Sequence, residues 1–420
     1  MLKNKTFLSF ILLSFFVGFI FGEDTLGGGK SDYQYHEKYF FYFYLDFLDT
    51  LKNFPISNYT GNAEGMRNSP IFYMIFSLFL KMGFKISSLK FINLIIILPM
   101  GFFLYECINI KFKNISSTNK FYLLSIFLLS PTIRTLLAWP YPFLWALSFF
   151  IISLYFYLKF EHSPNNSKKI KLAYYNIISL ALAAYFTPNF SVFSLYFFYK
   201  FYLHFRNSKE TIKIIFLNIF LALPAIYFLI TKDFYLLNAE VYDVDPFVKY
   251  NIINKIVIIT TILFLFFLPL VPKIKDLKLS LLKANYLNLN FLVLLLFIFV
   301  NIFFYNFLEG AGGGIFFHLS NILLNNSLIV YFIFTISILL FYLLNLYNFN
   351  NILIFSLLVL YNLQFTIYYK YFDPLIVILI LFLFKFKDNN LIKSELIFKK
   401  YVIFYIFFLS LNFAKAYIDY

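Results

Sequence analysis

Asp32 is the residue of this sequence whose type and position are best suited to chemistry. It follows the glycine-rich run 27–31, soon after the first apolar stretch ends. A carboxylate held there by a fixed helix end, close to a membrane, could deprotonate a hydroxyl that then attacks a carbon centre. The alternative is a solvated acid after a glycine-rich turn. The run is not a phosphate loop, because no strand precedes it and its Lys-Ser spacing is wrong.

Three further polar side chains follow Asp32 before the second long apolar run. His36 lies on an aromatic and acidic segment, 33–51, whose spacing suits an amphipathic helix on a membrane surface. Glu64 and Arg67 precede a proline that could open a helix. The planar guanidinium of Arg67 could bind a phosphate, or it could form a loop salt bridge with Glu64.

Three cationic or titratable side chains stand at later connections between apolar runs. Arg134 closes one run beside Trp139 and could bind a ligand, or it could extend to the lipid headgroups. His318 follows a glycine-rich loop whose backbone could approach a ligand closely. Lys370 lies before an Asp-Pro turn and is another candidate phosphate contact.

The acids of the connection 231–250 are the candidate metal ligands. Asp243 and Asp245, with other acids nearby, could hold a divalent cation through carboxylate oxygens. Two carboxylates alone are weak evidence for a metal site. A divalent cation is nevertheless the one cofactor that the sequence suggests.

The elements that position these side chains are predicted to be membrane-spanning helices. Of 420 residues, 61% are hydrophobic and 13% are charged, which is more apolar surface than a water-soluble core could hide. The apolar runs are about 15 to 20 residues long, as helices need to cross a hydrocarbon layer. Segments such as 291–304 are apolar on every face, so they do not show the alternation of a membrane β-barrel.

The net charge of +15 marks topology rather than a nucleic-acid partner. The Lys and Arg residues fall in short connections between apolar runs instead of a clustered stripe, so we expect no nucleic-acid binding. The single Cys107 excludes an internal disulfide framework.

The basic connections predict which loops face the cytoplasm. Segments 111–120, 159–171, 200–213, 273–283 and 385–400 are expected inside by the positive-inside rule. This places the amino terminus inside, the carboxyl terminus outside, and a long first loop, 23–88, outside. The apolar amino-terminal segment could be a cleaved signal peptide or an uncleaved first helix. The lack of a small-x-small cleavage site favours the helix.

The sequence therefore predicts an all-α, polytopic transmembrane bundle in one domain, 1–420, with amphipathic surface helices in the first outer loop. Segment 70–82 has too few apolar residues to cross and is expected on the outer surface. About thirteen spans remain, at 6–22, 89–108, 121–137, 143–158, 172–186, 190–204, 212–230, 251–271, 287–308, 327–347, 351–368, 374–386 and 400–416.

This layout resembles the GT-C superfamily of membrane glycosyltransferases, including its mannosyltransferase and arabinosyltransferase branches. The resemblance rests on the early acid Asp32 in a long outer loop, on the proline-aromatic segment Asn68–Tyr73, and on Ser130–Thr135 at the second outer loop. Segment 134–144 contains no acid, unlike many members of the superfamily, so Asp32 is the one acid to which the resemblance assigns catalysis.

The resemblance implies an inverting transfer of a hexosyl or pentosyl group from a polyprenyl-phosphate carrier to a lipid-linked or cell-surface acceptor. Asp32 would act as the general base, with the outer-face residues His36, Glu64, Arg67, Arg134, His318 and Lys370 binding substrate. The implied partners are the polyprenyl-phosphate sugar donor, a lipid or glycan acceptor and membrane lipids, in a bacterial inner membrane. The competing interpretation is a transporter or a lipid or polysaccharide flippase, for which internal repeats and ionisable residues within spans would be expected.

Overall fold

The computed structural model describes residues 2–26, 28–54, 68–113, 115–206, 208–231, 251–271, 289–307, 312–362, 366–387 and 395–418. Within these ranges every regular element is a helix, apart from an isolated bridge between Gly312 and Ile367. The chain divides into two compact units, Met1–Asp243 with Val402–Tyr420, and Val244–Tyr401. Each unit is described by itself. The expectation of an all-α protein is confirmed.

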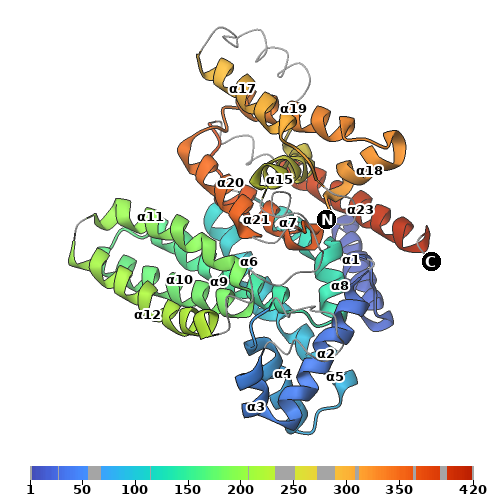
Figure 1. Ribbon diagram of the computed structural model, residues 1–420, viewed down its shortest axis with the longest axis vertical. Helices are drawn as coiled ribbons and strands as arrows, with labels where there is room; N and C mark the ends of the chain where they lie inside the picture. Colours follow the sequence, from blue (N-terminus) through green and yellow to red (C-terminus); the bar gives the residue numbers. More distant parts are fainter. Residues whose placement is uncertain are drawn as a thin grey trace. The chain divides into compact units, whose positions relative to one another are not determined.

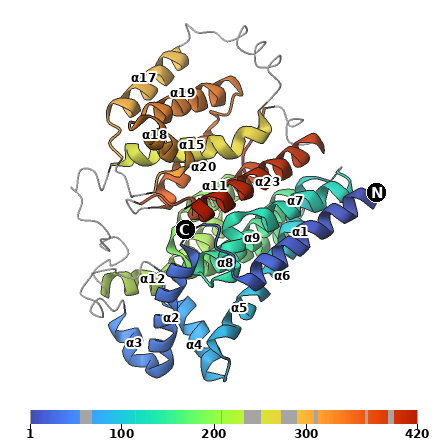
Figure 2. The same cartoon turned by 90° about the vertical axis from the view of Figure 1, so that its right-hand side faces the viewer.

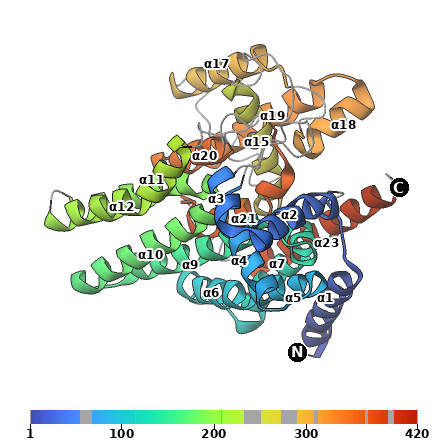
Figure 3. The same cartoon turned by 60° about the horizontal axis from the view of Figure 1, so that its bottom comes forward.

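The first unit begins with α1 (Leu2–Phe21), which runs beside α7 (Ser117–Leu129), as Figure 2 shows. Between them in sequence come α2 (Gly29–Leu45), α3 (Phe47–Asn53), α4 (Ile71–Lys81), α5 (Ile86–Ile95) and α6 (Ile97–Lys111). Figure 3 shows α2, α3 and α4 gathered together. The buried aromatic side chains of α2 and α4 join them; the rings of Phe40 and Phe76 stack with centroids 5.0 Å apart.

The rest of the first unit is a layer of helices in which α9 (Pro142–His162), α10 (Asn166–Phe186), α11 (Phe193–Phe205) and α12 (Lys209–Thr231) lie side by side (Figure 1). The 3-10 turn η1 (Pro188–Val192) joins α10 to α11. A hydrogen bond from Asn176 Nδ2 to Ser153 Oγ (2.7 Å) ties α10 to α9. Such polar contacts hold apolar helices together where lipid gives no hydrophobic driving force.

The second unit is built around α15 (Ile252–Phe267). Its other helices are α17 (Leu289–Phe303), α18 (Gly314–Leu324), α19 (Leu328–Leu343), α20 (Phe349–Tyr361) and α21 (Leu375–Phe382), with the short 3-10 turns η2 (Leu268–Leu270) and η3 (Tyr369–Tyr371). The last helix, α23 (Glu395–Ile418), contributes to both units.

Five helical segments of the described chain are long and apolar enough to cross a membrane. They are Ile86–Lys111, Pro142–His162, Lys209–Thr231, Ile252–Leu270 and Ile397–Ala414. A sixth span would need α7 and α8 (Pro131–Ala138) together, and this pair is bent by 58°. An integral membrane protein with several helical spans therefore follows, whereas the described helices do not confirm a count of thirteen.

Two of the expected spans form shorter helices than predicted, as their local structure shows. Segment 121–137 breaks because Pro131 starts a new helix and the Ser130 hydroxyl accepts a hydrogen bond from the Ile133 N–H (3.2 Å), which makes Ser130 an N-cap. Segment 374–386 forms α21, which has 8 residues and so spans about 12 Å, well short of a hydrocarbon core.

The two surface helices expected in the first loop are present as helices. Segment 70–82 forms α4, and segment 33–51 forms α2 and α3. These two are separate because Asp46 leaves helical geometry and its side chain accepts a hydrogen bond from the Asp49 N–H.

Candidate functional site

A buried ion pair joins the end of α1 to α8. The guanidinium of Arg134 donates to the carboxylate of Glu23 through Nε to Oε1 (2.7 Å) and through Nη2 to Oε2 (2.5 Å). The two side chains are only 3% and 4% exposed. Nη2 of Arg134 also donates to the backbone oxygen of Ser14 in α1 (2.9 Å). Because this geometry satisfies the guanidinium inside the protein, Arg134 is fixed as a link between two helices.

Gly18 makes room for this pair on the surface of α1. A Cβ atom at Gly18 would overlap the Glu23 carboxylate and lie 2.7 Å from Nη2 of Arg134. Both neighbours are held by the pair itself, so neither can move aside cheaply. The glycine is therefore a packing requirement of the ion pair.

The next residue, Asp24, fixes the start of α2. Its carboxylate accepts hydrogen bonds from the backbone N–H groups of Gly28, Gly29 and Lys30, at 3.3, 3.0 and 2.9 Å. These are amides that the helix itself leaves unsatisfied, and the negative charge suits the positive end of the helix dipole. The turn between α1 and α2 is therefore fixed by two residues: Glu23 binds Arg134, and Asp24 binds the first backbone amides of α2.

Two contacts from α8 and the residue after it complete this junction. The indole Nε1 of Trp139 donates to the backbone oxygen of Gly22 (3.3 Å), and the hydroxyls of Thr25 and Thr135 lie 3.1 Å apart. Segment 22–30 is thus connected to residues 134–139 by ionic and neutral hydrogen bonds.

A polar pocket of about 410 Å³ lies at this junction. Its polar side chains are those of Asp24, Lys30, Lys90 and Trp139, and its apolar wall comes from the end of α1. Among the described residues, neither Lys30 nor Lys90 forms an ion pair with a carboxylate. Two ammonium groups beside an apolar helix end are suited to binding an anionic group such as a phosphate.

Asp32 lies one helical turn into α2, close in sequence to Lys30. Its side chain is partly exposed, and its backbone N–H donates to the Gly28 oxygen (3.0 Å). It does not line the pocket of Lys30 and Lys90 as the structure stands. The predicted general base is therefore next to the cationic pocket in sequence and on the same helix as Lys30.

Glu37 is another acid on α2, and its pKa differs from the ordinary value. Partial burial raises the pKa of Glu37 above its ordinary value. Glu37 lines a surface hollow of about 480 Å³ together with Ser31 and Lys38. A carboxylate with a raised pKa is a stronger base once it is ionised, so Glu37 is the second acid to consider for proton transfer.

His36 lies inside the protein instead of facing a substrate. Its side chain is 4% exposed, and Nδ1 lies 2.9 Å from the hydroxyl of Tyr73. The Tyr141 ring meets it edge-on at a centroid distance of 4.7 Å. His36 thus connects α2 to α4, and we assign it a packing role.

Two predicted site residues belong to the second unit. His318 is exposed on α18, and Lys370 lies in η3 with its Nζ 5.5 Å and 5.7 Å from the ring centres of Tyr368 and Tyr371. The predicted residues Glu64, Arg67, Asp243 and Asp245 lie outside the described residues. Across the part of the chain that is described, no group of three or more His, Cys, Asp or Glu side chains could hold a metal ion.

Sequence reasoning missed Glu23, Asp24, Lys30 and Lys90 as site residues. A signal existed for three of them. Glu23 and Asp24 are the first acids after α1, and Lys90 stands inside the predicted span 89–108, where an ionisable residue is a functional hypothesis by default.

No family model, curated protein or solved structure matches this chain.

Proposed function

We propose that the protein is a membrane glycosyltransferase. It transfers a sugar from a polyprenyl-phosphate carrier to a lipid-linked or cell-surface acceptor at the extracytoplasmic side of the membrane. The observation that carries the proposal is the pocket at the end of α1, in which the ammonium groups of Lys30 and Lys90 lie beside an apolar helix end. A lipid phosphate needs this combination, because its charge requires cations while its chain requires an apolar surface. The Asp24 carboxylate, which also lines the pocket, accepts hydrogen bonds from the backbone N–H groups at the start of α2.

The proposal gives the residues of this junction separate roles. Lys30 and Lys90 bind the phosphate and stabilise the charge that develops on it when the sugar leaves. Asp32 deprotonates the acceptor hydroxyl, which attacks the sugar from the face opposite the phosphate and inverts its configuration. Glu23 and Arg134 fix the turn that leads into α2, the helix that carries Lys30 and Asp32, and Asp24 fixes the start of that helix.

The proposal includes the membrane topology expected from the charges. The amino terminus is cytoplasmic, and residues 23–88 lie outside, in a bacterial inner membrane. About thirteen crossings belong to this proposal. They require shorter apolar helices such as α17, α19 and α20 to cross as well, and segment 374–386 to cross although its helix α21 has only 8 residues.

The test is transfer by purified protein in lipid vesicles that contain a radiolabelled polyprenyl-phosphate sugar. Lys30→Gln and Lys90→Gln should each weaken donor binding and raise KM. Lys85→Gln is the matched control, because Lys85 is exposed, lies outside the pocket and precedes α5. If the labelled donor crossed the vesicle membrane without transfer to any acceptor, the protein would be a flippase and the proposal would fail.

A further inference from the structure

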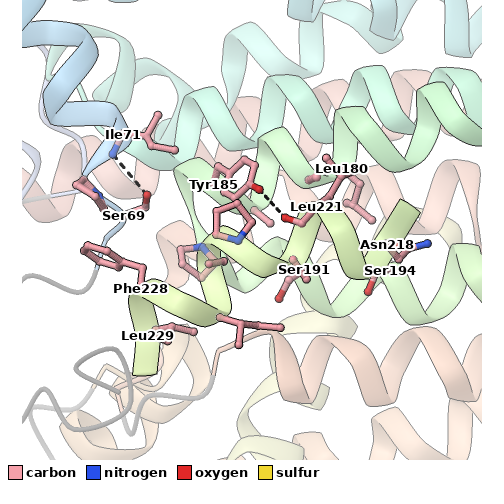
Figure 4. A pocket seen from close by; sticks show the side chains of 18 of the residues that line it. Ser69, Ile71, Leu180, Tyr185, Ser191, Ser194, Asn218, Leu221, Phe228 and Leu229 are labelled. Carbon is pink, nitrogen blue, oxygen red and sulfur yellow. Dashed lines mark hydrogen bonds between the residues drawn. The ribbon is translucent and has the colours of Figure 1, made fainter. Parts of the chain in front are cut away.

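A third hollow in the first unit lies between α10 and α12. Its volume is about 580 Å³, larger than that of the two hollows described above. Figure 4 shows side chains of α10, α12, the η1 region and the start of α4 around it. Cavities of roughly 300 to 1,000 Å³ hold small organic ligands in other proteins. The hollow is therefore large enough for a ligand of that size.

The hollow exists because its facing walls carry small side chains. Ala181 and Ala184 face it from α10, and Ala222 and Ala225 face it from α12. In each helix the two alanines are three residues apart, so they lie on one face. The space that larger side chains would fill is left open along both walls.

A proline in α12 contributes to the same opening. Pro224 stands inside the helix, where it has no N–H to donate and its ring displaces the carbonyl of the preceding turn. The hydroxyl of Tyr185, from α10, donates to the backbone oxygen of Leu221 at 2.5 Å. Tyr185 thus donates to a backbone oxygen three residues before the proline and connects the two walls (Figure 4).

The hollow is neutral. None of the described residues that line it is charged, and its polar groups are hydroxyls and one amide, from Ser69, Tyr185, Ser191, Ser194 and Asn218. A phosphate in such a place would lack cations, in contrast to the pocket of Lys30 and Lys90. The charge pattern therefore fits an uncharged chain with ester or hydroxyl oxygens at most.

The hollow opens onto the exposed surface of α12. α12 is a candidate membrane span of which only 6% is buried. Ile219 and Ile226 line the hollow and are nevertheless 51% and 46% exposed, so they form its edge toward the bilayer. A hydrocarbon chain could enter from the side without leaving an apolar environment.

We infer that this hollow binds one fatty acyl chain of a bilayer glycerolipid. The four alanines and Pro224 leave the space for the chain, and the hydroxyl and amide groups satisfy its ester oxygens. The site goes beyond the proposed function and does not depend on it, because lipid binding here needs no sugar transfer.

One other occupant fits less well. A polyprenyl phosphate would place its charged head near lining residues that carry no charge.

The test is photolabelling in vesicles of dioleoylphosphatidylcholine that contain a trace of the same lipid with a diazirine on one acyl chain. Adducts should map by peptide mass spectrometry to 177–185 and 218–229. Ala222→Trp fills the hollow and should reduce these adducts about tenfold. Leu223→Trp is the control, since Leu223 is 52% exposed on the same helix but does not line the hollow.

A second variant, Ala184→Leu, fills the hollow from the opposite wall and should reduce labelling in the same way. For each variant, the gel-filtration profile and thermal midpoint show whether the protein is folded. Unchanged labelling in both folded filling variants would overturn the inference. Suppression of labelling by unlabelled polyprenyl phosphate would assign the hollow to that occupant instead.

Discussion

Three carboxylates follow α1 closely, and their surroundings separate their chemistry. Glu23 is buried in its ion pair with Arg134, and Asp24 accepts hydrogen bonds from three backbone N–H groups at the start of α2. Asp32 is partly exposed on the first turn of that helix. A general base needs access to a substrate, so the partly exposed Asp32 is the acid of the three that the proposal makes the base.

Asp32→Asn should lower the turnover of sugar transfer by about 10² to 10⁴, because the amide keeps the size of the side chain but cannot accept the proton. Asp24→Asn should change turnover little, since an amide oxygen can still cap α2. Initial-rate assays at saturating donor would compare the two. A large loss in Asp24→Asn with activity retained in Asp32→Asn would move the base to Asp24, and Glu37→Gln would test the remaining acid.

The ion pair of Glu23 and Arg134 should behave as a coupled unit. Arg134→Gln should lower the free energy of unfolding in detergent by about 3 to 5 kcal/mol, since it leaves a buried carboxylate without its partner. The double variant Glu23→Gln/Arg134→Gln should be more stable than Arg134→Gln alone. Denaturant titration of the four proteins gives the coupling energy, and simple additivity of the two losses would show that the pair does not act as a unit.

At this scale the sequence predicted positions better than partners. It singled out Arg134 as a substrate-binding residue, because nothing local indicates Glu23, which lies 111 residues earlier. His36 was expected to face substrate, yet its aromatic neighbours come from α4 and from Tyr141 before α9. Pairings over such separations depend on how helices pack, which periodicity does not encode.

At the scale of elements, the break between α7 and α8 places Arg134 within reach of Glu23. A continuous helix through 130 would point its carboxyl-terminal turns elsewhere, whereas the bend of 58° turns α8 toward α1. The Ser130 cap and Pro131 are therefore part of the site even though neither lines the pocket.

Ser130→Ala should destabilise the protein by about 1 kcal/mol, because the Ile133 N–H loses its capping acceptor in a buried setting. Ser117→Ala, in the exposed first turn of α7, is the control and should change stability little. Thermal unfolding followed by circular dichroism compares the two variants. Equal midpoints would mean that the cap contributes nothing to stability.

The sequence predicted which segments are helical more reliably than where helices stop. The apolar periodicity of 70–82 predicted the helix that is α4, and the amphipathic spacing of 33–51 predicted the helical segment that forms α2 and α3. Ser130-Pro131 is a recognisable start signal for a helix, but it stands within the long apolar run that predicts one span over 121–137. The short α21 shows the same limit, since composition alone does not reveal that a run of apolar residues forms only two turns of helix.

At the scale of the whole molecule, the composition was sufficient to predict a helical membrane protein. An apolar content of 61% leaves few other solutions. The division into two units was not predicted, because no change in composition marks residues 243 or 401.

The topology can be tested with single cysteines in a Cys107→Ser background. Lys52→Cys, on exposed α3 in the first loop, should react with a membrane-impermeant maleimide in intact cells. Lys168→Cys, exposed at the start of α10 in a basic connection, should react only after the membrane is permeabilised. Labelling of Lys168→Cys in intact cells would invert the scheme.

The separation between Glu23 and Arg134 also sets an order of events during synthesis. Ribosomes add about 5 to 20 residues per second, so roughly 5 to 20 s pass between the two residues. Throughout that interval the nascent α1 ends in a carboxylate whose counter-ion has not been made, beside an empty notch at Gly18. The first loop can therefore take its final position only after α8 has emerged, which makes the candidate site a late product of insertion although its acids are among the first residues to be translated.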